Sequence, residues 1–582
     1  MSNLEHYFTQ PATARQRQYE AIRAIVIDKL PVPQAAKLFG YSQNTLYSLL
    51  RDVRRGKIEL FPASSAPGPK EPQTPESVRN MLIAYRKQNL SCHDIVIRLE
   101  EEQGYKISKR TVENIVAKAG FSKLSRRSFE QRGLTLKNRI VPERSSPLDL
   151  STLEPFSVDC PVAGIYFFMP YIIDSGIIEI VKQCQLPASS TINEKQACLS
   201  MLLLKLVGNR RLSHMDAYDH EPGLGVFAGL NILPKTSYMS TYSCRTSEDM
   251  LTIFQAEILK KFQNIYPELY SAEYINLDFH SIPHFGDQSQ MEKVWCGARG
   301  KAMKGANTLF AQDADSNVIL YTKADILRKN ETNEIKKFAD YWRSIKGSMD
   351  ETLVFDCRLT SYKILDDLNQ DDKTKIKFIT LRKRNKTLLE QVEKIGENEW
   401  QKKYLPIPKR KHKHCSVHEM TVTLPGCKTQ LRQIIVKDHG RAAPTFIVTN
   451  NWELPLKEVL MVYAKRWHIE QKLAELVGFF NLNALSSPLM IRIHFDILWT
   501  LIADTLYRRF AQDLPRFEHE QADAIFRKFI DMPGKLIFDG EKFVLKIRKR
   551  AMTPILLGVS ALKNKIVVPW LGGRTMEIHW TA

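Results

Sequence analysis

The sequence lacks any Cys-x-x-Cys pair, and its nine cysteines are scattered singly over 582 residues. This pattern indicates reduced thiols in a cytosolic compartment and argues against a disulfide framework. The first ten residues, MSNLEHYFTQ, carry an early acidic residue and no apolar core, so we expect no signal peptide. The longest uncharged apolar stretch, residues 161–173, is too short to cross a membrane. We therefore expect a soluble, cytoplasmic protein without membrane contact.

Negative charge is scarce relative to positive charge. The chain has 64 Asp and Glu against 84 Lys and Arg, a net charge of +20. Such an excess favours polyanionic partners, because each neutralised phosphate releases condensed counterions. The alternative is a generically basic protein whose charge only aids solubility. Residues 1–150 hold 25 Lys and Arg against 15 Asp and Glu, half of the excess in a quarter of the chain, which favours nucleic acid binding there.

The first 60 residues have the pattern of three short helices, with apolar residues at helical spacing through 18–30, 31–41 and 42–56. Gly40 stands where a tight turn between helices needs a positive φ angle, and Ser42 is a favourable N-cap for the third helix. The pattern predicts a helix-turn-helix DNA-binding domain over residues 1–60. Its third helix would present to DNA the side chains of Gln43, Asn44, Thr45, Tyr47 and Arg51.

Residues 74–125 repeat this pattern and predict a second helix-turn-helix domain. Ser108 would cap its third helix, which presents Lys109, Arg110 and Asn114. The Pro-, Ser- and Gly-rich residues 61–73 are predicted as a linker, and a second linker is expected over residues 126–150. A small trihelical unit that never touches DNA would show the same pattern. Two units in series, each with a polar and basic third helix, favour DNA binding.

A strand pattern in the middle of the chain contains two aspartates that are candidate metal ligands. Residues 273–279, EYINLDF, alternate as a strand that places Asp278 among apolar neighbours, where a carboxylate is costly unless it is paired or binds a metal. A hairpin turning at residues 313–317, a helix, a strand ending at Asp356, a second helix and another strand follow. This order predicts a ribonuclease-H-like α/β core. In that core the first and fourth strands lie side by side, so Asp278 and Asp356 would face one pocket.

The third carboxylate lies on a helix predicted for VLMVYAKRWHIEQKLAELVGFF. Tyr463, Arg466 and Glu470 are spaced three and four residues apart, so they share one face over two turns. Glu470 would complete a carboxylate cluster that holds two Mg²⁺ ions, with Mn²⁺ as a substitute, since hard oxygen ligands suit these ions. Arg466 and Tyr463 would contact DNA phosphates. Each of these residues alone is more often structural or solvated, and it is their joint occurrence that indicates chemistry.

The segment YAKRWHIEQ resembles the signature of bacterial insertion-sequence transposases of the DDE class, Tyr-x2-Arg-x3-Glu-x6-Lys, and INLDFHSIPHFGD and LVFDCRLTSYKIL resemble the segments with its two aspartates. The likeness covers about residues 270–515, and tandem front domains are compatible with it. It implies metal-dependent DNA cleavage and strand transfer by Asp278, Asp356 and Glu470. One departure is that Val477 stands at the lysine position. Lys472 or another cation would have to supply that phosphate contact, or the contact is absent.

Glu470 lies 114 residues after Asp356, farther than a bare core requires, and the surplus predicts a β-rich insertion near the DNA end. Its basic residues Lys409, Arg410 and Lys411 are candidate phosphate contacts. The fold class expected is multidomain, with all-α helix-turn-helix units followed by an α/β ribonuclease-H-like core with a β-rich insertion. Beyond the front domains and linkers, the expected divisions are a helical domain (151–270), the core (271–384 and 446–515), the insertion (385–445) and a small C-terminal region (516–582).

Three functions are consistent with these patterns. The first is a transposase that binds double-stranded DNA at element ends and at a target. It would act as a homodimer or larger assembly, since two ends must be held together. The second is a domesticated DNA-binding regulator that no longer cuts, and the third is a nuclease without strand transfer. The three acidic residues favour an enzyme over the regulator, but the same pocket would serve cleavage with or without strand transfer.

Overall fold

A computed structural model shows two compact units, residues 1–140 and 141–582, which are described separately. Both units contain helices, and in the part of the chain that the structure describes every strand lies in the second unit. The structure describes residues 8, 10–61, 74–124, 143–211, 214–215, 217–286, 291–324, 326–359, 361–370, 375–407, 412–484, 487 and 489–582.

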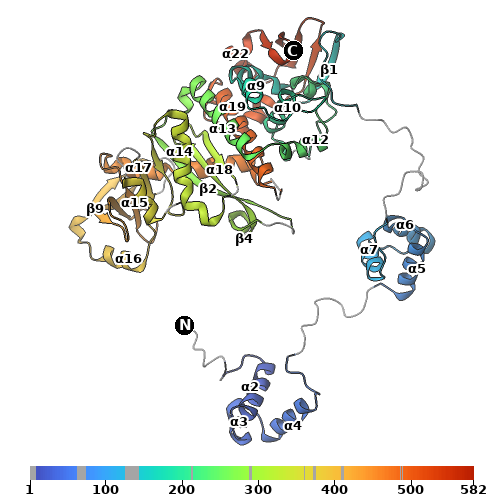
Figure 1. Ribbon diagram of the computed structural model, residues 1–582, viewed down its shortest axis with the longest axis vertical. Coiled ribbons are helices and arrows are strands. Elements are labelled where there is room, and N and C mark those ends of the chain that lie inside the picture. Colours follow the sequence, from blue (N-terminus) through green and yellow to red (C-terminus); the bar gives the residue numbers. More distant parts are fainter. Residues whose placement is uncertain are drawn as a thin grey trace. The chain divides into compact units, whose positions relative to one another are not determined.

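The first unit contains two sets of three helices, each around a small core of its own (Figure 1). The first set is α2 (Ala14–Val26), α3 (Val32–Phe39) and α4 (Gln43–Arg54). The second set is α5 (Glu76–Lys87), α6 (Cys92–Gln103) and α7 (Lys109–Lys118). The expected helices are therefore present in both segments.

The turns and caps of the two sets follow the sequence. Gly40 ends α3 with φ of 69°, a left-handed conformation that glycine adopts without a steric penalty. Ser42 begins α4, where its Oγ accepts the backbone N–H of Thr45 at 3.1 Å. Ser108 caps α7 by the same bond to Thr111, also at 3.1 Å. Each cap satisfies one of the free N–H groups of the helix start, a contribution of about 1 kcal/mol.

The second unit combines helices with two sheets. Its helices are α8 (Met169–Asp174), α9 (Ile177–Gln183), α10 (Glu194–Leu206), α11 (Pro222–Phe227), α12 (Thr236–Thr241), α13 (Glu248–Ile265), α14 (Glu334–Lys346), α15 (Tyr362–Gln370), α16 (Lys386–Glu393), α17 (Leu456–Lys465), α18 (Trp467–Gly478), α19 (Met490–Gln512), α20 (Ala522–Ile525), α21 (Thr553–Leu556) and α22 (Ser560–Lys563). Its strands are β1 (Phe156–Cys160), β2 (Tyr274–Pro283), β3 (Lys293–Cys296), β4 (Lys301–Asp313), β5 (Ile319–Lys323), β6 (Thr352–Val354), β7 (Phe378–Leu381), β8 (Gln401–Tyr404), β9 (His414–Thr423), β10 (Gln430–Lys437), β11 (Thr445–Thr449), β12 (Gly534–Phe538), β13 (Phe543–Arg548), β14 (Ile566–Val568) and β15 (Arg574–Thr581).

The larger sheet is mixed, and its centre has the order β5-β4-β2-β6-β7. Strand β2 pairs antiparallel with β4, and β4 pairs antiparallel with β5. On the other side β2 pairs parallel with β6, which pairs parallel with β7. The pairing of the strand that carries Asp278 with the strand that precedes Asp356 is therefore confirmed.

The hairpin expected around residues 313–317 is the turn between β4 and β5. Asp313 is buried there, and one of its carboxylate oxygens accepts the backbone N–H groups of Asp315 and Ser316. The other oxygen accepts the N–H of Ala272 at 3.1 Å, which ties the turn to the start of β2. Because these bonds compensate a buried carboxylate, Asp313 is a structural residue at this turn.

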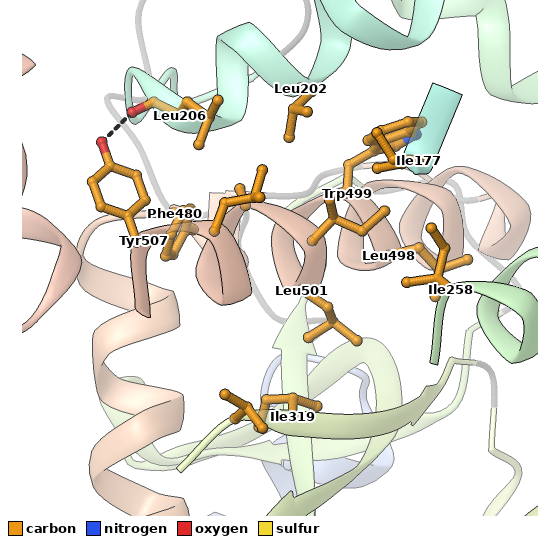
Figure 2. Packing of buried hydrophobic residues seen from close by; sticks show 14 of the residues in the cluster. Ile177, Leu202, Leu206, Ile258, Ile319, Phe480, Leu498, Trp499, Leu501 and Tyr507 are labelled. Atoms are coloured by element: carbon orange, nitrogen blue, oxygen red, sulfur yellow. Dashed lines mark hydrogen bonds between the residues drawn. The ribbon is translucent and has the colours of Figure 1, made fainter. Parts of the chain in front are cut away.

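The second unit is centred on helix α19, in which every residue from Ile493 to Tyr507 is buried. Figure 2 shows Leu498, Trp499 and Leu501 of this helix among apolar side chains of α10, α13 and β5. The hydroxyl of Tyr507 donates to the carbonyl oxygen of Leu206 at the end of α10. A helix that is buried over so much of its length lies inside a core, so α19 holds the helices against the larger sheet.

The second sheet contains strands from two regions that the sequence analysis predicts as separate domains. Its order is β1-β12-β13-β15-β14, and β1 pairs with β12 over Phe156–Cys160. Residues 151–270 therefore contain a strand as well as helices, and residues 516–582 share a sheet with that strand. Strands β8, β9 and β10 of the expected insertion likewise extend the larger sheet beyond β11. The pairing of β1 with β12 joins strands that are far apart in the sequence and leaves no local pattern. For this reason the sequence analysis did not predict that the two regions share a sheet.

One helix pair has the length and apolar composition of a bent membrane span, namely residues Ala163–Asp174 and Ile177–Gln183 at an angle of 60°. No single helix in the described ranges is long and apolar enough to span a membrane.

Candidate active site

Asp278 and Asp356 lie at matching positions on neighbouring strands. In the parallel register of β2 and β6, Asn276 is opposite Val354. Each aspartate follows two residues later in the same chain direction, so the two aspartates lie at the same level on adjacent segments. The backbone N–H of Phe279 donates to Asp278 at 2.9 Å. The sheet thus brings together two aspartates that are 78 positions apart in the sequence.

Arg466 joins Glu470 to this pair. Its guanidinium lies 3.4 Å from a carboxylate oxygen of Asp278 and 2.9 Å from one of Glu470. The guanidinium carbon is also 5.9 Å from the ring centre of Tyr463. Of these side chains Glu470 is the most exposed, at 58%, whereas Arg466 and Asp278 are 15% and 18% exposed. The structure therefore brings Tyr463, Arg466 and Glu470 to one place beside Asp278.

The helix that carries these residues is not continuous. The sequence pattern predicts one helix, but α17 ends at Lys465 and α18 begins at Trp467, with Arg466 between them. The N–H of Arg466 donates to Tyr463, and the N–H of Ile469 donates back to Arg466, both to a carbonyl three residues earlier. The segment contains neither Pro nor Gly at this point, so its sequence does not signal the break. Arg466, at the break, forms its ion pair with Glu470 of α18.

The carboxylates repel one another. Burial raises the pKa of Asp278 to about 6, against the opposing effect of the Arg466 guanidinium, and the Asp356 and Glu470 carboxylates raise it further. Burial also raises the pKa of Tyr463 to about 12. A site that holds several acidic groups close together favours the binding of further positive charge.

Asp356 is held by a network that the sequence analysis misses. The backbone N–H of Arg358 donates to Asp356 at 2.8 Å. The Arg358 guanidinium is anchored in turn on Glu331 at 2.8 Å and on Asn307 at 3.3 Å. Asn307 also donates to Glu331 at 2.9 Å. Glu331 and Asn307 are both buried, so this network fixes the loop that carries Asp356.

A cavity of about 890 Å³ opens beside these residues. Asp356, Tyr463, Arg466 and Glu470 form one side of it. Residues from the strands beyond β11 form the other side, with apolar side chains and with His412, His439 and Arg441. No spacing in the sequence connects these last three residues with the carboxylates, so the sequence analysis did not assign them to this site.

Divalent ions fit the three carboxylates by donor chemistry, because Mg²⁺ and Mn²⁺ prefer carboxylate oxygens. A cation would also relieve the repulsion that raises the pKa of Asp278. In the described ranges, however, no three His, Cys, Asp or Glu side chains lie close enough together to hold an ion. Arg466 contacts Asp278 and Glu470 from the position where a cation is expected. A divalent ion at these carboxylates would compete with Arg466.

Lys472 does not take the role of the signature lysine, whose position is occupied by Val477. Its side chain is 6% exposed, and its ammonium lies 2.9 Å from both Glu475 and Asp504. Burial raises the pKa of Asp504 to about 6, Lys472 opposes this effect, and Glu475 adds to it. Val477 itself is partly buried and packs against the core. The suggestion that Lys472 contacts phosphate is therefore wrong, because its ammonium is enclosed by two carboxylates.

The candidate recognition residues of the first unit are exposed. On α4 they lie around the buried Leu46, and on α7 around the buried Val112 and Val116. The exposed side chains are those of Gln43, Asn44, Thr45, Tyr47, Arg51, Lys109, Arg110 and Asn114. Arg51 lies 3.2 Å from Asp52, and Lys109 lies 3.8 Å from Glu113. Lys409, Arg410 and Lys411 of the insertion lie outside the described residues.

No protein-family model matches the sequence, and no curated protein is significantly similar to it. Among solved structures the chain is similar to a piggyBac transposase synaptic complex with hairpin DNA, at 11% identity and a TM-score of 0.32, over 62% of this chain and 78% of that chain. It is also similar to a Mos1 transposase paired-end complex with the left transposon end, at 9% identity and a TM-score of 0.15, over 61% and 75%. For a Mos1 mariner paired-end complex with Mn the values are 9% and 0.14, over 62% and 76%. We draw no conclusion about this chain from scores of this size.

Proposed function

We propose that the chain is a DDE-class transposase of a bacterial insertion sequence, with Asp278, Asp356 and Glu470 as its metal-binding catalytic residues. The observation that supports this most is the parallel pairing of β2 with β6, which puts both aspartates at the same level on adjacent strands. Arg466 then connects Asp278 with Glu470 on α18. Three acidic residues from distant parts of the sequence are thus close enough for Asp356 and Glu470 to raise the pKa of Asp278, although buried carboxylates are costly.

The order of the central strands supports a ribonuclease-H-like core. Strands β2, β4 and β5 form an antiparallel meander, and β6 and β7 add in parallel on the other side of β2. Helix α14 lies between β5 and β6 in the sequence, and α15 lies between β6 and β7. This is the order of strands and helices that the sequence predicted for such a core. Strands β8 to β10 are then an insertion that enlarges the sheet next to the cavity.

Bound Mg²⁺ or Mn²⁺ ions would activate a water molecule or a 3′-hydroxyl and stabilise the leaving oxygen of a phosphodiester. Asp278 and Asp356 would hold these ions from the sheet, and Glu470 would hold them from α18. The network of Glu331 and Arg358 keeps Asp356 in position. Arg466 neutralises the carboxylates while the pocket is free, and it would turn with Tyr463 to the DNA phosphates when the cations enter.

The exposed third helices of the first unit would bind the element ends. Polar side chains at the start of α4 and α7 would reach base edges, and the nearby cations would reach phosphates. Half of the net positive charge of the chain lies in residues 1–150, as DNA binding there requires. Two ends must be held together for transposition, so we propose a dimer or a larger assembly on DNA.

The test is cleavage of a duplex that carries the inverted repeat flanking the reading frame, with and without Mg²⁺. We expect nicking at the repeat terminus that requires Mg²⁺. Asp278→Ala and Glu470→Ala should abolish nicking and retain binding, because binding rests on the first unit. Asp340→Ala is the matched control, because this carboxylate on α14 is 76% exposed and lies outside the pocket. Nicking by either pocket variant at the parental rate would refute the assignment.

The same reaction with a target duplex separates the three candidate functions. Joining of the cleaved 3′ end to the target indicates a transposase, and cleavage without joining indicates a nuclease. Binding of the repeat without any cleavage indicates a domesticated regulator.

A further inference from the structure

The hairpin of β3 and β4 shares a face of the sheet with Asp278. Phe310 of β4 is opposite Asp278, and eight residues earlier Ala302 is opposite Trp295 of β3. Side chains two residues apart along a strand project from the same face, and directly opposed residues share a face. Trp295 and its neighbour Lys293 therefore project from the face that carries Asp278, beyond the carboxyl end of β2.

Two large aromatic rings are exposed at this hairpin, where folding alone gives no reason for their exposure. Strand β3 is at the edge of the sheet, with Val294 and Cys296 buried and Lys293 and Trp295 exposed. The Trp295 side chain is 61% exposed, and the ring of Phe285, just after β2, is 54% exposed. Large aromatic side chains left exposed on an edge strand favour association, and proteins usually cover them. The exposure of both rings points to a partner.

The charge around these rings is positive. Lys293, Arg299 and Lys301 are all exposed, and none of them forms an ion pair with a carboxylate of the described chain. The Arg299 guanidinium carbon lies 5.6 Å from the ring centre of Phe285. Cations complement phosphates, and exposed aromatic rings provide stacking or apolar contact to bases and sugars. The surface therefore fits nucleic acid better than an acidic or neutral protein partner.

The hairpin is fixed to the core. The backbone N–H of His284 donates to Lys304, and the N–H of Gly305 donates to Glu292. The Glu292 carboxylate accepts the N–H of Arg328 at 2.8 Å. A side chain at position 305 would collide with the carbonyl oxygen of Ile282 and with Val294, so glycine allows β4 to approach both. These contacts hold the exposed face in one orientation before any partner binds.

We propose that the exposed side chains of the β3–β4 hairpin, with Lys293 and Trp295 on one face and Arg299 and Lys301 at its turn, bind the DNA duplex that leads into the active site. This inference rests on the proposed function. Along β4 the eight residues between the positions opposite Asp278 and Trp295 span at most about 26 Å. At about 3.4 Å per base pair, the hairpin would reach the backbone within about eight base pairs of the cleaved phosphate.

The test measures binding of the full chain to a 60-base-pair duplex of arbitrary sequence, without divalent ions, over a range of salt concentrations. For Lys293→Gln/Arg299→Gln/Lys301→Gln we expect the slope of log affinity against log salt to fall by about 2 to 3, since each lost phosphate contact contributes about 0.9. The charge-matched control is Lys182→Gln/Lys235→Gln/Lys563→Gln, at exposed positions outside the hairpin. This control should keep the parental slope.

Trp295 provides an independent test of the same face. Trp295→Ala should lower the affinity roughly tenfold, whereas Trp295→Phe should keep most of it, because a ring still gives apolar contact to the sugars of the duplex. Trp452→Ala is the control, since Trp452 is also exposed, at 47%. Circular dichroism and thermal unfolding of each variant confirm that it folds like the parent.

The outcomes separate this inference from the proposed function. If the parent binds DNA and the hairpin variants bind with its affinity and salt slope, the hairpin inference is wrong and the proposed function stands. If the hairpin variants change only the mass measured by light scattering, the surface contacts a second copy of the chain, which also overturns the inference. If the parent binds no DNA, the proposed function fails as well.

Discussion

Arg466 and Asp278 form an ion pair at 3.4 Å across 188 positions of the sequence. The same guanidinium binds Glu470, so one cationic side chain holds two of the three acidic residues of the pocket. A divalent ion at this place must compete with that guanidinium.

Replacing Arg466 with alanine should increase the affinity for Mn²⁺. The substitution removes a guanidinium that competes with the ion for the carboxylates and also repels it. Hydrogen bonds to charged groups contribute about 1.5–3 kcal/mol, so we expect the Mn²⁺ affinity to rise on the order of tenfold. Isothermal titration calorimetry of the DNA-free protein measures this affinity. Arg466→Lys keeps the charge and should show a smaller gain. Equal Mn²⁺ affinity in Arg466→Ala and the parent would contradict the competition.

Replacing Lys472 with methionine should destabilise the fold and leave DNA affinity unchanged. The substitution leaves Asp504 and Glu475 without their cation in the core, at a cost of about 3–5 kcal/mol. Chemical denaturation measures the loss, and Lys182→Met at an exposed position is the control. A stable variant with weakened DNA binding would instead support a phosphate contact by Lys472.

The instability of Lys472→Met should depend on pH. The pKa of Asp504 in the folded protein is about 6, above its ordinary value, so its burial costs least when it is protonated at low pH. The folded state loses stability as pH rises from about 4 through the folded pKa. Without Lys472 the pKa of Asp504 in the folded protein rises further, so the loss of folding stability extends to higher pH. The deficit relative to the parent should be smaller at pH 5 than at pH 8, and an equal deficit at both would show that Asp504 is not its source.

Replacing Glu331 with alanine should slow nicking about tenfold or more without weakening DNA binding. Glu331 touches neither DNA nor metal in this account, but it anchors Arg358, whose N–H holds Asp356. Single-turnover rates and binding affinity separate positioning from recognition. Glu331→Gln, which can still accept a hydrogen bond, should restore part of the rate. A loss of affinity equal to the loss of rate would argue for a role in binding instead.

On the first unit, Arg51→Ala and Asn44→Ala should have different effects. Loss of Arg51 should weaken binding to all sequences and lower the salt slope by about 1, because Arg51 would contact phosphate. Loss of Asn44 should mainly reduce the preference for the inverted repeat over unrelated DNA. Binding isotherms on both duplexes measure the two effects. Unchanged binding in both variants would remove α4 from the DNA interface.

Local rules predicted much of this structure from the sequence. The positive φ at Gly40 and the caps at Ser42 and Ser108 depend on neighbours within a few residues, and the structure contains them. The pairing of β2 with β6 was predicted from the order of elements and is also present. These features need only local sequence or the sequence of elements along the chain.

Features that depend on distant partners were not predicted. The pairing of Phe156 with Phe538 joins strands almost 400 residues apart. The burial of Lys472 depends on Asp504 of α19, because a lysine on an amphipathic helix gives no sign of facing inward. The anchoring of Arg358 on Glu331 and the break of the helix at Arg466 also left no local pattern.

Replacing Asp356 with cysteine tests whether this residue binds a metal ion during cleavage. Thiolates bind Mg²⁺ poorly and softer ions such as Mn²⁺ better. The measurement is the nicking rate of Asp356→Cys on the inverted-repeat duplex in Mg²⁺ and in Mn²⁺. We predict no nicking in Mg²⁺ and partial recovery in Mn²⁺. Nicking at the parental rate in Mg²⁺ would contradict metal binding by Asp356.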